Sequence, residues 1–230
     1  MADEAPVLDR RAVVTRSLLG WGVVAGPFYV VVGTVLALTR PGFDLSRHAL
    51  SLLTLGDLGW FQRANLVLTG CMVLAAGLGV IRAIRSGRGL AIGALVLVDG
   101  AALVLSAIFI PDPAGNFPPG VPGGEVTASG VLHLVFGALG FVAMAGAALA
   151  HSAWSRGIGA RGRAIVALLL GAVILLGFFA GAALSSGPAG VALIWLAVLA
   201  QWAWLGLACA QIYAWSPHPL GERASAPAQP

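Results

Sequence analysis

The sequence is poor in charged residues and has no lysine. Only 10% of its 230 residues are charged, and all thirteen basic residues are arginine. An ordinary globular domain has about 25% charged residues, so this chain lacks the side chains that would cover a water-exposed surface. Hydrophobic residues make up 59% of the sequence, and its mean hydropathy is +0.93. The composition therefore excludes a soluble globular protein and indicates an integral membrane protein.

Cysteine is also scarce. Cys71 and Cys209 are the two cysteines, and each lies inside a long apolar run. A disulfide scaffold or a cysteine-rich metal site needs cysteines at characteristic spacings. We therefore expect neither, and we interpret both residues as small packing residues.

Six apolar runs are long enough to cross a membrane, since about 20 helical residues span a hydrocarbon core of about 30 Å. We predict an all-α polytopic transmembrane bundle of six helices, with spans at about residues 18–39, 64–82, 89–110, 130–151, 164–185 and 190–214. The first run is longer than the apolar part of a signal peptide, so we expect it to be retained as a span. Residues 1–17 and 215–230 are expected to form cytoplasmic tails, the second of them disordered.

The arginines alternate between the predicted loops. Three lie in each of the N-terminal tail, the second loop and the fourth loop: Arg10, Arg11, Arg16, Arg82, Arg85, Arg88, Arg156, Arg161 and Arg163. The third loop carries Asp112 and Glu125 with no basic residue, and the first loop alone breaks the alternation. The positive-inside rule then places both termini in the cytoplasm. We expect the protein in the inner (cytoplasmic) cell membrane. The net charge of +4 is explained by these helix-end arginines, so we expect the lipid bilayer as a partner and no nucleic acid.

The first outer loop has helical periodicity. Its polar residues recur at i, i+3, i+4 and i+7: Asp44, Arg47, His48 and Ser51. Leu45, Ala49 and Leu52 would form the opposite face. This spacing predicts a short amphipathic helix at the membrane interface, whose polar face either meets water and headgroups or forms a site. Asp44 and His48, one turn apart, could pair.

The third loop fixes a carboxylate near a membrane-buried histidine. Prolines on both sides of Asp112 end the third span and restrict its backbone. His133 lies about one turn inside the fourth span, where a histidine needs a polar partner. Asp112, at similar depth, is the predicted partner.

Together these residues define a candidate outer-face site of Asp44, Arg47, His48, Ser51, Asp112 and His133. We favour binding of a lipid headgroup or small amphiphile, with Arg47 contacting the anion and Asp112 and His133 orienting it. One alternative is a membrane-embedded hydrolase or transferase. If it used a divalent metal, the ligands would be Asp44, His48, Asp112 and His133. The ligand spacing is not that of a known metal motif, so no cofactor is predicted, and a purely structural cluster remains an alternative.

A second candidate site lies in mid-membrane. Asp99 is near the centre of the third span, with Tyr29 and Gln201 at similar depth in other spans. A carboxylate there is costly to insert, so it should face the bundle interior. The alternatives are an interhelical hydrogen bond and a small proton-coupled transporter centred on Asp99. The sequence indicates neither the oligomeric state nor whether the protein is an enzyme.

Four short segments resemble a known family. They are Pro41–Leu53 (PGFDLSRHALSLL), Gly59–Gly70 (GWFQRANLVLTG), Phe109–Gly115 (FIPDPAG) and Gly130–His133 (GVLH). Their Gly-aromatic-Asp turn, Arg-His pair, Pro-x-Asp-Pro-like turn and Gly-x-x-His resemble the signature of the domain of unknown function (DUF) 998 family. The resemblance covers roughly residues 20–214.

This resemblance implies a six-helix integral membrane protein, mostly bacterial, with no established activity. The family is similar to the Frag/DRAM/Sfk-like group, which suggests lipid-linked roles by analogy. Two positions depart from the family pattern. Ser129 stands where many members have a second histidine, which weakens a paired-histidine metal centre, and Leu52 stands where a glutamate is frequent.

Overall fold

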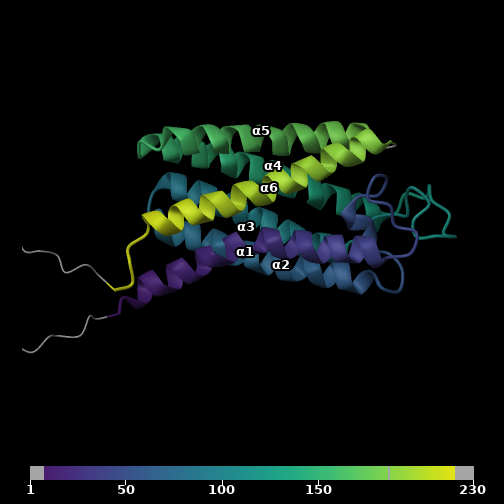
Figure 1. Cartoon of the computed structure of the whole chain (residues 1–230), viewed down its shortest axis with the longest axis horizontal. Coiled ribbons are helices and arrows are strands. Elements are labelled where there is room, and N and C mark those ends of the chain that lie inside the picture. The colour runs from purple at the N-terminus through teal and green to yellow at the C-terminus, as the bar shows by residue number, and fades with distance from the viewer. Residues whose placement is uncertain (1–7, 186, 221–230) are drawn as a thin grey trace, which may run out of the picture.

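The computed structural model describes residues 8–185 and 187–220, and this part of the chain is all-helical. Its α-helices are α1 (Arg10–Thr39), α2 (Gly59–Ala83), α3 (Gly87–Ile108), α4 (Ala128–Gly157), α5 (Arg161–Ala183) and α6 (Pro188–Trp215) (Figure 1). One short 3₁₀ helix, η1 (Leu50–Thr54), lies in the first loop. All six α-helices are long and apolar enough to cross a membrane, which confirms the predicted six-helix transmembrane class.

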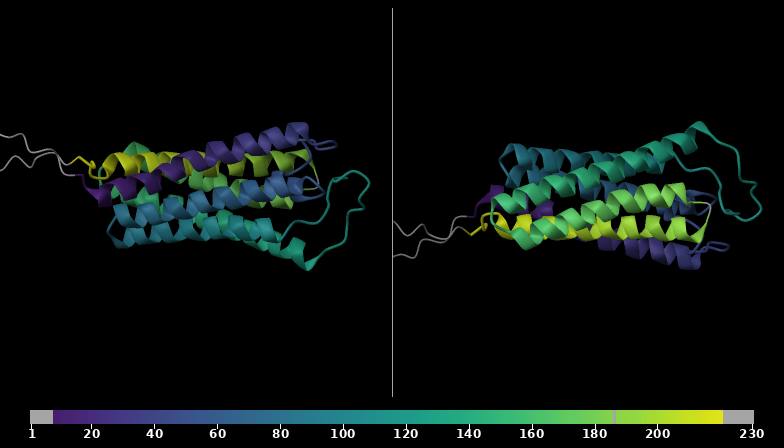
Figure 2. Two further views of the ribbon diagram at one scale, coloured as in Figure 1. Left: turned by 90° about the horizontal axis from the view of Figure 1, so that it is seen from below. Right: turned by 90° about the horizontal axis from the view of Figure 1, so that it is seen from above.

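The six helices form a closed ring. Each packs mainly against its neighbours in sequence, and α6 packs against α1 to complete the circle. The views in Figure 2 show the helices running up and down the same long axis, with the third loop projecting beyond one end. The connections after α2, α4 and α5 are short, which makes the helices that they join antiparallel neighbours, whereas longer loops follow α1 and α3.

Small residues allow α1 to lie close to α6. A Cβ atom at Gly26 would lie 2.8 Å from the Cβ atom of Trp202, and one at Gly22 would overlap the Cys209 side chain. The glycine pair therefore permits close helix approach, as small residues do in membrane bundles. Cys209 is buried at this contact, as its interpretation as a packing residue requires. Cys71 is exposed on the bundle surface, so for that residue the interpretation is wrong.

The first helix begins earlier than the apolar run. Asp9 caps it by accepting hydrogen bonds from the N–H groups of Arg11 and Ala12, so the polar residues from Arg10 onward form its first turns. The N–H of Asp9 also donates to the carbonyl of Pro219, and the chain before α1 thus lies beside the chain after α6. Residues 1–7 and 221–230, in the two predicted tails, lie outside the described residues.

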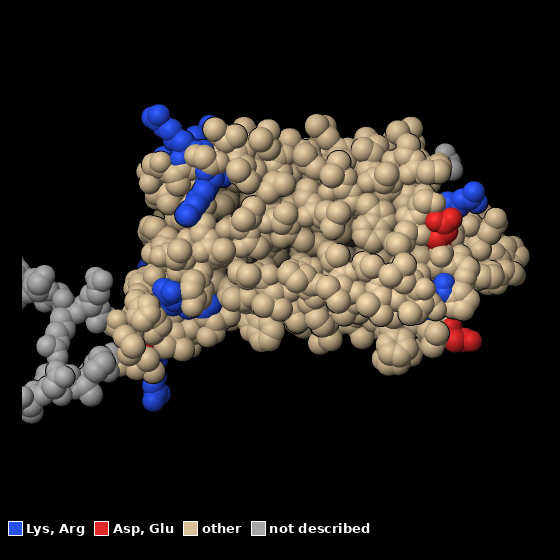
Figure 3. Space-filling model, in the orientation of Figure 1, with Lys and Arg blue, Asp and Glu red and all other residues tan. Residues whose placement is uncertain are grey.

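The two ends of the bundle differ in charge. We call the end at which α1 begins and α6 ends the arginine-rich end. Its helix ends and connections carry nine of the described arginines: Arg10, Arg11, Arg16, Arg82, Arg85, Arg88, Arg156, Arg161 and Arg163 (Figure 3). The opposite end, formed by residues 40–58 and 109–127, we call the loop end. It carries Asp44, Asp57, Asp112 and Glu125 beside Arg40 and Arg47. Arg63, near the start of α2, donates to the carbonyl of Thr54 in this end.

The predicted amphipathic helix of the first loop is not formed. The N–H groups of Arg47 and His48 both donate to the carbonyl of Asp44, which closes a turn rather than starting an α-helix. The following η1 has Leu50, Leu52 and Leu53 buried. Adjacent leucines point in different directions, so they can all be buried only if the segment packs into the loop end of the bundle.

Candidate functional site

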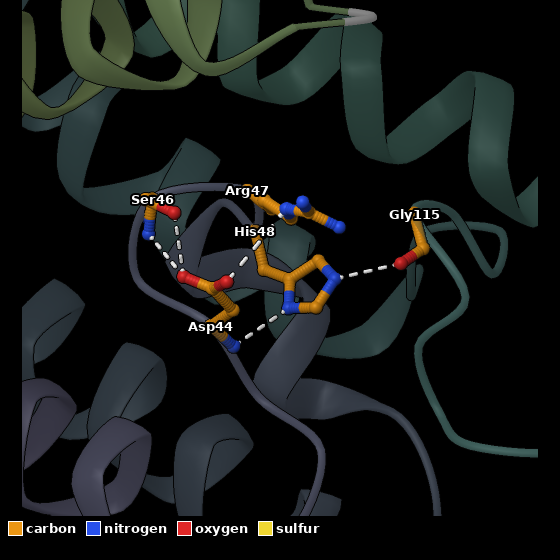
Figure 4. Close-up of polar contacts among 5 residues, drawn as sticks. All are labelled: Asp44, Ser46, Arg47, His48 and Gly115. Carbon is orange, nitrogen blue, oxygen red and sulfur yellow. Dashed lines mark hydrogen bonds and ion pairs between the residues drawn. The ribbon is translucent and has the colours of Figure 1, made fainter.

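The loop end is held together by a buried histidine. His48 is 3% exposed, and its Nδ1 accepts a hydrogen bond from the N–H of Asp44 at 2.9 Å (Figure 4). Because Nδ1 is the acceptor, the ring proton is on Nε2, which donates to the carbonyl of Gly115 at 2.8 Å. Both ring nitrogens of His48 are therefore used, and they join the first loop to the third.

Aromatic rings enclose this histidine. Its ring centre lies 5.2 Å from that of Phe43 and 5.5 Å from that of Phe117, and the two phenylalanines meet edge to face at 5.2 Å. Phe117 is completely buried. Such contacts add to the apolar burial that holds the two loops together.

The Asp44 carboxylate does not pair with the His48 side chain. Its carboxylate accepts hydrogen bonds from the Ser46 hydroxyl at 2.7 Å and the Ser46 N–H at 2.8 Å, and it lies 3.8 Å from the Arg47 guanidinium. The hydrogen bonds from Ser46, side chain first, hold the pKa of Asp44 below its usual value of 3.8. The Arg47 side chain is 71% exposed, so this ion pair contributes little to stability.

Asp112 anchors the start of α4. Its carboxylate accepts hydrogen bonds from the Thr127 hydroxyl at 2.6 Å and the Thr127 N–H at 3.1 Å. Thr127 is in turn the N-cap of α4, since its hydroxyl accepts from the N–H of Gly130 at 3.0 Å. A carboxylate at this position also interacts favourably with the positive end of the helix dipole.

His133 has a different partner from the predicted one. Its Nδ1 lies 2.8 Å from the carbonyl of Phe109 and 3.2 Å from that of Ser106, so it donates to the C-terminal end of α3. The unpaired carbonyls of a helix end are natural acceptors for a membrane-buried N–H group. The predicted pairing of Asp112 with His133 is therefore not formed, because each residue is satisfied by backbone or by Thr127.

The structure divides the predicted outer-face residues among separate contacts. Asp44, Arg47 and His48 belong to the first-loop turn, Asp112 to the α4 cap, and His133 to the α3–α4 contact. Ser51 is half-buried, and its carbonyl accepts from the Thr54 hydroxyl at 2.7 Å. Among residues 8–185 and 187–220, no three His, Cys, Asp or Glu side chains are grouped so that they could hold a metal ion.

A groove lies at the loop end, between α1, η1 and α2. It has a volume of about 210 Å³ and is lined by Leu36, Thr39, Arg40, Leu53, Leu58 and Phe61. Most of the lining is apolar, and Arg40 supplies its positive charge. The Arg40 guanidinium donates to the carbonyl of Leu55 and lies 5.8 Å from the centre of the Phe117 ring. These contacts hold the guanidinium in place and leave further N–H donors available.

The candidate site predicted from the sequence did not include Arg40. Its position directly after the first apolar run, before Pro41-Gly42, was the available signal. An arginine at that place must lie where the helix leaves the membrane.

The mid-membrane residues are brought together in part. The Gln201 side-chain N–H₂ of α6 donates to both carboxylate oxygens of Asp99 at 3.3 and 3.5 Å. Tyr29 instead packs its ring against Trp202, with ring centres 5.1 Å apart, and its carbonyl accepts from the Asn65 side chain at 3.2 Å. Asp99 does not line the groove at Arg40.

A second set of buried polar residues was missed. The Asn65 side chain donates to the side-chain oxygen Oε1 of Gln62 at 3.1 Å and accepts from the Thr69 hydroxyl at 3.4 Å, all within α2. The spacing of Gln62, Asn65 and Thr69 at i, i+3 and i+7 places them on one helix face and could have predicted this inward stripe.

The comparisons with known proteins identify the family. The chain matches the family described as "Protein of unknown function (DUF998)" over residues 23–211. The chain belongs to the DUF998 family. This match confirms the resemblance found in the loop motifs. No curated protein and no solved structure matches the chain.

Three of the four family-like segments contribute to the contacts described above. His48 lies in Pro41–Leu53, Asp112 in Phe109–Gly115, and His133 in Gly130–His133. In this DUF998 protein these segments join loops and helix ends at the loop end.

Proposed function

We propose that this protein binds an anionic amphiphile at the loop end, with the phosphate or carboxylate at Arg40 and the hydrocarbon chain in the groove. The observation that carries the proposal is the apolar groove of about 210 Å³ with a fixed guanidinium in its wall. A hydrocarbon chain would follow Leu36, Leu53 and Phe61, which line the groove. A phospholipid headgroup meets both requirements, because it joins a charged phosphate to acyl chains.

The distribution of arginines supports an assignment of this binding to one side of the membrane. The nine arginines at the arginine-rich end favour a cytoplasmic position for both termini, in the inner membrane. The loop end would then face outward, and the ligand would come from the outer leaflet of that membrane.

The geometry favours binding over hydrolysis. A general base needs a free nitrogen or carboxylate beside the reacting group. Both ring nitrogens of His48 are bonded to backbone groups and the Asp112 carboxylate is bonded to Thr127, so neither residue is a free base. His133 donates from Nδ1 to the carbonyls of α3 and keeps an unprotonated Nε2, but it does not line the groove. Arg40 replaces Arg47 as the proposed anion contact, since Arg47 pairs with Asp44 and does not line the groove.

The test measures binding of phosphatidylglycerol to the full chain in detergent by native mass spectrometry. We compare wild type with Arg40→Gln, and with Arg47→Gln as the charge-matched control. A charged hydrogen bond of about 1.5–3 kcal/mol corresponds to a loss of at least about tenfold in affinity for Arg40→Gln and none for Arg47→Gln. Equal affinities for the three proteins would overturn the proposal.

A second pair of variants keeps the test valid if Arg40→Gln unfolds. Leu58→Trp would fill the groove, whereas Leu38→Trp adds the same ring on an exposed part of α1 that does not line it. Only Leu58→Trp should weaken phosphatidylglycerol binding. Unchanged binding by Leu58→Trp would contradict a chain in the groove.

A further inference from the structure

A second groove lies at the opposite end of the molecule. The last turns of α4 and the first turns of α5 enclose a volume of about 420 Å³ at the arginine-rich end. Its lining consists of Ser152, Arg156, Arg161, Ala164, Ile165 and Leu168. None of these residues takes part in the loop-end groove.

Two arginines form the polar part of this second groove. The Arg156 guanidinium donates to the buried Ser152 hydroxyl at 3.3 Å, which holds it against α4. Arg161 is the first residue of α5 and faces the same groove. Within residues 8–185 and 187–220, the one ion pair is that of Asp44 with Arg47, so no described acidic side chain neutralises either arginine. The groove therefore presents two positive charges to a ligand.

The start of α5 adds a favourable helix dipole. Its N-cap residue is Ala160, whose side chain cannot accept hydrogen bonds from the first-turn N–H groups. The N–H of Arg161 is bonded to the carbonyl of Gly159, so the start of α5 acts on an anion through the positive end of the helix dipole. Arg156, in the last turn of α4, approaches that place from the neighbouring helix.

The remaining wall of the groove is apolar and runs along α5 from its first turn toward the middle of the helix. Ile165 is 58% exposed and Leu168 41% exposed, and Ala164 lies beside them. A free anion would use only the arginines and leave this wall empty. A ligand that joins an anionic head to a hydrocarbon chain would contact both parts.

We propose that the groove between α4 and α5 binds an anionic phospholipid, with its phosphate at Arg156 and Arg161 and an acyl chain along Ala164, Ile165 and Leu168. The occupant comes from the leaflet in which the arginine-rich end lies. Since its phosphate would contact both helices, the bound lipid fastens the α4–α5 connection. The site is separate from the loop-end groove and does not rest on the function proposed for it.

The experiment uses the full chain in detergent and measures binding of phosphatidylglycerol, phosphatidylcholine and inorganic phosphate by native mass spectrometry. The groove variant is Arg156→Gln/Arg161→Gln. Its control is Arg10→Gln/Arg11→Gln, which removes two exposed arginines from the same end without touching the groove. Every protein is also measured with the Arg40→Gln substitution present, so that lipid bound at the loop-end groove is distinguished from lipid bound between α4 and α5.

We expect phosphatidylglycerol to bind wild type and the control equally and the groove variant at least tenfold more weakly. Phosphatidylcholine, which has no net charge, should bind all three weakly. An equal loss in the control would mean a general attraction of the charged end for anions, and would overturn the site. No loss in either variant would overturn it as well.

The apolar wall has its own test, which also covers misfolding of the arginine variant. Ile165→Ala/Leu168→Ala keeps both charges and shortens the wall. It should weaken phosphatidylglycerol binding several-fold and leave binding of inorganic phosphate unchanged. If inorganic phosphate binds wild type as tightly as phosphatidylglycerol does, the groove is a site for a soluble anion and the lipid proposal is wrong.

Discussion

The imidazole of His48 donates from Nε2 to the carbonyl of Gly115 at 2.8 Å. The two residues are 67 positions apart in sequence, and their contact joins the first loop to the third. Gly115 has φ of +62°, and a Cβ atom there would lie 2.9 Å from Cδ2 of the same ring. The position therefore needs glycine both for its backbone conformation and for the close approach of the histidine. This contact brings the third loop over the groove-forming first loop.

Loss of the histidine should destabilise the loop end. His48→Leu fills a similar volume but leaves the Asp44 N–H and the Gly115 carbonyl without partners, at a cost of about 1–3 kcal/mol. We expect a lower midpoint of thermal unfolding, measured by circular dichroism in detergent. Arg47→Gln, whose side chain is mostly exposed, serves as the control and should unfold as wild type does. An unchanged midpoint for His48→Leu would mean that the two loops are held together without this residue.

The Asp112–Thr127 contact should behave as a helix cap. Thr127→Ala removes the N-cap of α4 and should cost about 0.5–2 kcal/mol. Asp112→Ala should cost a similar amount, and the double variant less than the sum, because the two side chains share one hydrogen bond at 2.6 Å. Thermal unfolding of the four proteins measures this coupling. Strict additivity would show that the two residues act independently.

The pH response of the first-loop turn follows from Asp44. Its pKa is lowered in the folded protein, first by the Ser46 hydroxyl, so its contribution to the turn is complete above the ordinary Asp pKa of 3.8. That contribution is lost as the pH falls through the lower, folded-state pKa. The Ser46 amide signal in a ¹⁵N NMR titration should shift with a midpoint below 3.8. Asp44→Asn is the control and should abolish the shift, and a wild-type midpoint above 3.8 would contradict the hydrogen bonds.

Asp99 should tolerate an amide better than a hydrocarbon. Asp99→Asn keeps an oxygen that can accept from the Gln201 side chain, whereas Asp99→Leu leaves that buried donor without its partner. In a membrane bundle one such hydrogen bond contributes about 0.6–1.7 kcal/mol. Thermal unfolding should therefore rank wild type close to Asp99→Asn, with Asp99→Leu below both. Equal stability of the Asn and Leu variants would show that the hydrogen bond to Gln201 does not contribute to stability.

The membrane class could be predicted because its signal is local and strong. Each helix contains a predominantly apolar stretch of about 20 residues, which is the length that a transmembrane helix needs. The helix ends were less accessible to prediction. Arg10 to Ser17 are mostly polar, and they extend α1 because Asp9 caps it.

The loop end was predicted in composition but not in geometry. The i, i+3, i+4, i+7 spacing from Asp44 to Ser51 fits a helix, yet burial of Leu50, Leu52 and Leu53 gives a turn followed by η1. His133 was assigned a side-chain partner because sequence patterns do not reveal the free carbonyls at the end of α3. The groove at Arg40 depends on how α1, η1 and α2 converge, which no local pattern records.

The most direct test of amphiphile binding at the loop end is photo-crosslinking with a phosphatidylglycerol that carries a photoreactive group near the start of one acyl chain. We expect labelled peptides from residues 36–61 of the wild type. The Arg40→Gln and Leu58→Trp variants should lose this label, and the Arg47→Gln and Leu38→Trp controls should retain it. Labelling of residues 36–61 that is equal in all five proteins, or labelling confined to other parts of the chain, would contradict the proposed site.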